Sequence, residues 1–230
     1  MRSRFLIFAG LAGLLLGTAK TVFAGEVLDR IVATVNGHII LQSDWEDAVR
    51  YEAFIAGRQP GDLTGKEGKA VLDRLIDQEL LREQMHASDF QQAPNEEIAR
   101  RIAEVRQQYA GASSAEGWQS LLTRYRLTEE ELRERIALQL NLMRLVDARL
   151  RPTVKIDGKS IESYYNQELL PQLRQTGAKA VSLAQVSGKI KDLLTEQKVS
   201  QLLVTWLHNL RAEGDIHTSS EPADAAVEAR

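Results

Sequence analysis

The pair Asn36-Gly37 constrains this chain more than any other feature, because it predicts a tight turn between two short strands. Residues 31–35 before it are apolar or β-branched, and three apolar residues follow over 39–41. Asn-Gly readily takes the two positive φ angles of a type I′ turn, so the stretch is expected to form a β-hairpin. An isolated hairpin is only marginally stable in water. Another part of the chain must therefore cover it.

The pattern of apolar residues after the hairpin predicts a series of helices. Ser43 and Glu46 have the spacing of a capping box, so a first helix is expected over 43–56. Further helices are expected over 66–87, from Pro94 to Tyr109, around 118–125, over 128–150, over 159–175 and over 183–213. The helix over 66–87 is apolar nearly all round, which is typical of a central helix. The predicted fold class is mostly α, with a small β element.

The helix over 183–213 has two sets of apolar residues, before and after residue 195, that point to nearly opposite sides. Either a straight helix contacts two different bodies, or the helix kinks near 195–198. In both cases the second half needs a partner of its own, and Trp206 is assigned to the core there. Ile216, after Gly214, could add a short strand to the edge of the hairpin. The two ends of the chain are therefore expected to share one core.

Residues 1–24 have the features of a removable signal peptide. Arg2 and Arg4 precede an apolar run of 12 residues, and 22–24 fit a small-residue cleavage site that ends at Ala24. A membrane span needs about 20 apolar residues, so a transmembrane anchor is the weaker alternative. The sequence predicts export, with no stable membrane insertion after the signal is removed.

Charge and cysteine content exclude several classes of function. The formal net charge is −3 for the whole chain and −6 without residues 1–24, which hold three basic residues and no acidic one. Phosphate binding needs a basic stripe, so no nucleic-acid partner is expected. The sequence has no cysteine, which excludes disulfides, thiol catalysis and zinc–thiolate sites.

Motifs for catalysis or metal binding do not stand out. The four histidines, His38, His86, His208 and His217, include no pair at a spacing of four. Serine-hydrolase, phosphate-loop and dinucleotide motifs are also missing. We therefore expect no catalytic residue, no metal and no cofactor.

Two stretches of the sequence resemble the SurA family of periplasmic chaperones. The first lies over 35–44 and contains Val35-Asn36-Gly37, Ile40 and Ser43-Asp44, and the second lies over 193–216. The helical region between them, to about Pro152, has a compatible layout. Full-length members carry one or two parvulin prolyl-isomerase domains between these ends. Here only 29 residues separate Pro152 from Ser182, whereas a domain needs about 50, so the parvulin unit is expected to be absent.

The resemblance implies an irregular helical chaperone core over 25–217 with a small N-terminal β-hairpin. Its parts would be a helical module over 25–152, a linker or weak helix over 153–182, and a C-terminal helix over 183–217 that packs back on the first module. Residues 218–230 are expected to be a disordered tail.

The function implied by the resemblance is ATP-independent binding of unfolded or partly folded polypeptides, such as outer-membrane proteins, in the periplasm. Two other classes stay open. One is an enzyme related to prolyl isomerases with an unrecognised catalytic unit, and the other is an envelope assembly subunit with a single fixed partner. The oligomeric state is also left open.

Four aromatic residues are candidates for contact with a client. Trp118 and Tyr125 lie on the narrow stripe of a short helix, and Tyr51 and Phe54 lie on the first helix. Narrow stripes usually face the body of a protein, so a core role is favoured for these residues, and contact with a client is the alternative. The proposed site is a cradle between these short helices and the central one, opened by a flexible break at 111–114.

Overall fold

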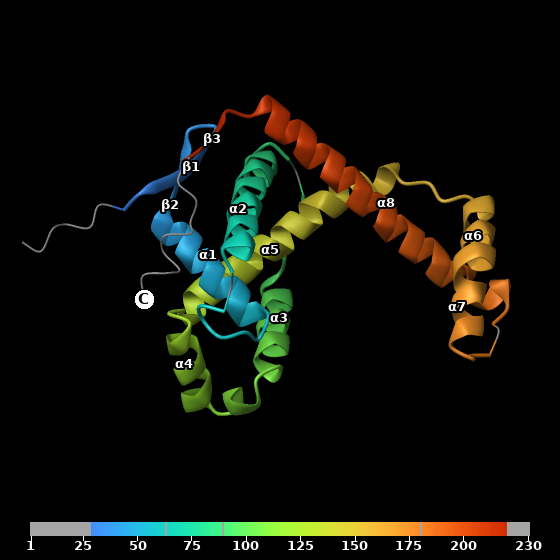
Figure 1. The fold of residues 1–230 in the computed structure, drawn as a ribbon, viewed down its shortest axis with the longest axis horizontal. Coiled ribbons are helices and arrows are strands. Elements are labelled where there is room, and N and C mark those ends of the chain that lie inside the picture. Colours follow the sequence, from blue (N-terminus) through green and yellow to red (C-terminus); the bar gives the residue numbers. More distant parts are fainter. Residues whose placement is uncertain (1–28, 63, 89, 180, 220–230) are drawn as a thin grey trace, which may run out of the picture.

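The computed structural model describes residues 29–62, 64–88, 90–179 and 181–219 (Figure 1). These residues form a mostly helical fold with one small antiparallel sheet and a long helix near the C-terminus. The predicted fold class is therefore confirmed. The predicted signal peptide with its cleavage site at Ala24, and residues 220–230 of the predicted tail, lie outside the described residues.

The sheet contains the expected hairpin and one further strand. Strands β1 (Ile31–Val35) and β2 (His38–Leu41) pair antiparallel across a turn in which Asn36 and Gly37 have φ angles of 48° and 85°. Strand β3 (Ile216–Thr218) pairs with the other edge of β1, so the order is β2-β1-β3. The assignment of Thr218 to the tail is wrong, because this residue pairs with Ala33.

Helix α1 (Gln42–Ile55) follows β2 without a loop, and its N-terminus differs from the prediction. The backbone N–H of Leu41 donates to the Asp44 carboxylate at 2.9 Å, while the Ser43 hydroxyl donates to Asp29. The expected capping box of Ser43 with Glu46 is therefore wrong. Strand pairing runs to Leu41, so the N-cap is Leu41, two residues before the Ser43 that the local motif suggests.

The helices that follow lie close to their predicted bounds. They are α2 (Gly65–His86), α3 (Asn95–Gln107), α4 (Ala115–Arg124) and α5 (Glu129–Leu150), with short 3₁₀ turns η1 (Ala110–Ala112) and η2 (Arg151–Thr153). Thr128 and Glu131 form a capping box at the start of α5. Pro94 precedes α3 as its N-cap rather than beginning it. Helix α2 contacts β1, α1, α5 and α8, which confirms its central position.

The predicted weak helix over 159–175 forms a small lobe. Helix α6 (Gly158–Tyr164) passes through a π-helical turn, η3 (Tyr165–Leu169), into α7 (Leu170–Gln175). Pro171 lacks an N–H and its ring crowds the preceding turn, so a widened turn just before it is physically expected. Figure 1 shows α6 and α7 at one end of the long helix, far from the sheet.

Helix α8 (Leu183–Glu213) runs unbroken from this lobe to the sheet (Figure 1). Its first half packs on α6 and its second half packs on α5 and α2. Of the two alternatives, the unbroken helix that contacts two bodies is therefore the one observed. A capping box of Ser182 with Gln185 begins the helix.

Three apolar clusters hold the described elements together. The aromatic core surrounds Phe54 and joins α1, α3, α4 and the start of α5. The hairpin core joins the sheet, α1 and α2, and both Leu210 and Ile216 pack against it. This contact confirms that the two ends of the chain share one core.

The third cluster corrects the role given to Trp206. This side chain is only partly buried and packs with Val146, Leu150 and Val199, while the Arg149 guanidinium lies 4.7 Å from the centre of its ring. Trp206 lies one helical turn before Leu210, so it reaches α5 rather than the hairpin. Trp206 therefore packs against a core cluster, as expected, but on α5 and not at the hairpin.

Candidate functional site

Three of the four candidate client-binding residues lie inside the aromatic core. Phe54, Trp118 and Tyr125 are 0%, 3% and 4% exposed. The Phe54 ring stacks on Tyr109 at 5.4 Å between centroids, and the rings of Tyr125 and Trp118 lie 5.3 Å and 6.2 Å from it. These rings fill the space of the predicted cradle. A client-facing role for Phe54, Trp118 and Tyr125 is therefore corrected to a core role.

Two tyrosine hydroxyl groups of the aromatic core also have hydrogen-bond partners within the protein. The Tyr125 hydroxyl donates to the Arg58 carbonyl at 2.7 Å, and the Tyr109 hydroxyl donates to the Phe54 carbonyl. Burial, with a smaller effect from Tyr125, raises the pKa of Tyr109 to about 12. Both hydroxyls donate to main-chain carbonyls near the end of α1 and so tie that end to the residues that follow α3 and α4.

The segment over 111–114 is tightly held and not the flexible break that the sequence suggested. The Arg106 guanidinium donates to the carbonyls of Ala112, Ser113 and Ser114, the last two at 3.1 Å and 3.0 Å. Ala112 itself is fully buried. Arg106 therefore holds in place the segment that would have to move for the predicted cradle to open.

A different hollow, which we name the client groove, lies between α1, α2, α5 and α8. Its volume is about 930 Å³. Its apolar lining consists of Ile55, Val71, Leu75, Leu81, Leu142, Met143, Val146, Val199, Leu203 and Leu207. Tyr51 lines it too, and it is the one predicted site residue that the structure places at this hollow.

Ion pairs between neighbouring elements surround the client groove. Arg74 on α2 pairs with Glu52 on α1, Arg151 after α5 pairs with Glu196 on α8 at 2.6 Å, and Arg211 on α8 pairs with Asp77 on α2 at 2.6 Å. In each case the partner carboxylate raises the arginine pKa. These side chains are partly exposed, so each pair contributes modestly to stability. Their main effect is to fix the positions of the walls.

Met143 marks the opening of the client groove, because 58% of its surface is exposed. A flexible thioether side chain adapts to partners of varied shape. The sequence did not identify Met143 or Leu142 as a site residue. The available signal was that the helix over 183–213 carries apolar residues on two sides.

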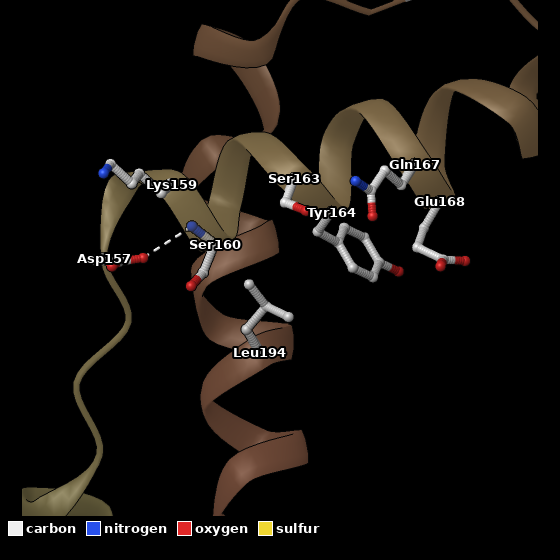
Figure 2. A pocket seen from close by; sticks show the side chains of 8 residues that line it. All are labelled: Asp157, Lys159, Ser160, Ser163, Tyr164, Gln167, Glu168 and Leu194. Carbon is white, nitrogen blue, oxygen red and sulfur yellow. Dashed lines mark hydrogen bonds between the residues drawn. The ribbon is translucent and has the colours of Figure 1, made fainter.

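A second hollow of about 510 Å³ lies on the lobe and differs in chemistry (Figure 2). Figure 2 shows polar side chains along α6 and η3, with Leu194 of α8 facing them. Asp157 accepts a hydrogen bond from the Ser160 backbone at 2.8 Å and caps α6. This polar surface suits an apolar ligand less well than the client groove does.

In the part of the chain that the structure describes, the His, Asp and Glu side chains form no group of three that could hold a metal ion. None of the helices in this part combines the length and the apolar character needed to cross a membrane.

Comparison with known families agrees with the resemblance of the hairpin region. A family model described as SurA-like N-terminal domain matches residues 4–146, which is more than half of the chain and includes the hairpin, α1 to α4 and most of α5. A comparison with curated proteins found no match. The chain therefore belongs to the SurA-like N-terminal domain family, a periplasmic family whose members have chaperone-related roles.

Proposed function

We propose that this protein is an ATP-independent periplasmic chaperone that binds unfolded or partly folded polypeptides, outer-membrane proteins among them, in the client groove. The observation that carries the proposal is an apolar hollow of about 930 Å³ with the exposed Met143 at its opening. Membership of the SurA-like family supports the same reading. Export through a signal peptide over 1–24 is part of the proposal.

Binding in such a groove is passive and reversible. Apolar side chains of the client gain free energy by leaving water, at roughly 25 cal/mol for each Å² buried. An unfolded client loses conformational entropy at the same time, so its affinity is modest. The contacts are apolar, so affinity should depend little on salt concentration.

The first prediction concerns Met143, the exposed side chain at the opening. Met143→Asp places a charge where an apolar client would lie, so the variant should lose most of its ability to suppress aggregation of a denatured outer-membrane protein. Its melting temperature should change little, because the side chain is 58% exposed. Light scattering during dilution of the denatured client measures the effect.

Val204→Asp is the matched control. Val204 lies on α8, is 68% exposed and does not line the client groove, so the same charge is introduced elsewhere. This variant should protect the client as the wild type does. Equal loss of protection in both variants would count against the client groove, and a wild-type protein without any protection would reject the proposed function.

The second prediction is that the protein does not catalyse prolyl isomerisation, because we propose client binding without a chemical step. The purified chain should leave the cis/trans conversion rate of a proline peptide at its background value in a protease-coupled assay. A rate that rises in proportion to protein concentration would favour the enzyme alternative. Co-purification of one fixed stoichiometric partner would favour an assembly subunit instead.

A further inference from the structure

One wall of the client groove carries a buried hydroxyl group with no hydrogen-bond partner. Tyr51 lies on α1, where its side chain packs at the edge of the aromatic core and also lines the groove. Within the described residues, its hydroxyl oxygen is buried and makes no hydrogen bond. Burial raises the pKa of Tyr51, against the opposing effect of Arg135, so the hydroxyl keeps its proton.

Other tyrosines of the same chain show which partner such a hydroxyl normally has. The hydroxyls of Tyr109, Tyr125 and Tyr165 each donate to a main-chain carbonyl. Buried polar groups in proteins are almost always hydrogen-bonded, because loss of water without a replacement partner is costly. The unsatisfied donor on Tyr51 therefore calls for a specific explanation.

Polar side chains of α5 lie beside Tyr51 in the client groove. Arg135 and Gln139 are one turn apart on α5 and line the groove beside it, and the Arg135 guanidinium lies 5.3 Å from the centre of the Tyr51 ring. On α2 and α8 the lining mixes apolar side chains, such as Leu75 and Leu203, with polar ones. A ligand that fits this lining carries hydrogen-bond acceptors as well as apolar side chains.

We propose that the Tyr51 hydroxyl donates a hydrogen bond to a main-chain carbonyl of an extended client segment in the client groove. This inference rests on the proposed function above. An extended segment has free carbonyls and places alternate side chains on opposite faces, whereas the carbonyls within a helix already accept bonds from its own backbone. Tyr51 thus makes the site selective for extended over helical segments.

The position of Arg135 defines how a client reaches this donor. The Tyr51 hydroxyl is closed to solvent, and the Arg135 guanidinium is one of the groups that lie against this side chain. Arginine has a long and flexible side chain, which swings outward as the client segment enters. The Tyr51 hydroxyl, which has no hydrogen-bond partner among the described residues of the free protein, then donates a hydrogen bond to the client.

Tyr51→Phe tests the inference, because it removes the hydroxyl and keeps the ring. The probes are a short fluorescent peptide with alternating apolar residues and a stapled, helical version of the same sequence. The variant should bind the extended peptide about two- to tenfold more weakly, the range expected for one hydrogen bond. Its affinity for the helical version should not change, and its melting temperature should stay the same or rise.

Tyr125→Phe is the matched control, since its hydroxyl bonds to the Arg58 carbonyl in the aromatic core. This variant should have a lower melting temperature and wild-type affinity for the extended peptide. The inference is overturned if Tyr51→Phe binds the extended peptide as the wild type does, or if both peptides are weakened equally. If the Tyr51 inference fails in this way but Met143→Asp still weakens binding of the peptide, the proposed function stands. A wild type that binds neither peptide nor the denatured client would reject both.

Discussion

Replacing Phe54 by Ala should lower the free energy of unfolding by about 3–5 kcal/mol, the range for removal of a fully buried aromatic ring. Phe54 is 0% exposed and lies between the rings of Tyr109, Trp118 and Tyr125. Its removal leaves a cavity at the point where α1, α3 and α4 meet. For a chain of this size the melting temperature should fall by roughly 6–20 °C.

Circular dichroism during thermal and urea unfolding measures this effect, and Ile39→Ala provides the control. Ile39 is exposed on the outer face of the sheet, so its truncation should change stability by less than about 1 kcal/mol. At a temperature well below the midpoint, Phe54→Ala should still suppress client aggregation. If Phe54→Ala instead loses client binding and keeps its stability, then Phe54 contacts the client, contrary to what its burial indicates.

Local chemistry explains why the hairpin and most helix bounds could be predicted from sequence. Asn36-Gly37 determines its turn through backbone preferences alone. The capping boxes at Thr128 and Ser182 satisfy backbone donors within three residues. Neither feature depends on a distant part of the chain, so the sequence is sufficient.

The start of α1 shows where local motifs fail. Ser43 and Glu46 have a suitable spacing, but strand pairing places the helix boundary at Leu41. The Gln42 N–H donates to the carbonyl of Arg30 at 2.7 Å, a contact across the hairpin. A long-range bond therefore decides between two local motifs that are only two residues apart.

The candidate site was harder to predict, because a stripe of apolar residues does not reveal which body it faces. Trp118 and Tyr125 point into the aromatic core only because α1 supplies Phe54 from far away in the sequence. Met143 is exposed because no described element covers that part of α5. Both outcomes depend on the arrangement of helices rather than on the periodicity of one helix.

The second large effect should come from removal of α8 and β3. A chain that ends at Ser182 loses Leu210 and Ile216 from the hairpin core, the pairing of β3 with β1, and the ion pair of Arg211 with Asp77. The remaining hairpin has one strand fewer and an open side, and two-stranded hairpins are marginal in water. The melting temperature should fall further than in Phe54→Ala.

Hydrogen exchange separates this explanation from general unfolding. Amides of β1 should lose protection in the chain that ends at Ser182, whereas amides of α3 and α4 should retain theirs, because the aromatic core contains no residue from α8. A chain that ends at Ser219 keeps α8 and β3 and should unfold with the wild-type midpoint. If the chain that ends at Ser182 keeps both its midpoint and its β1 protection, then α8 and β3 do not stabilise the hairpin, and the shared core contributes nothing to stability.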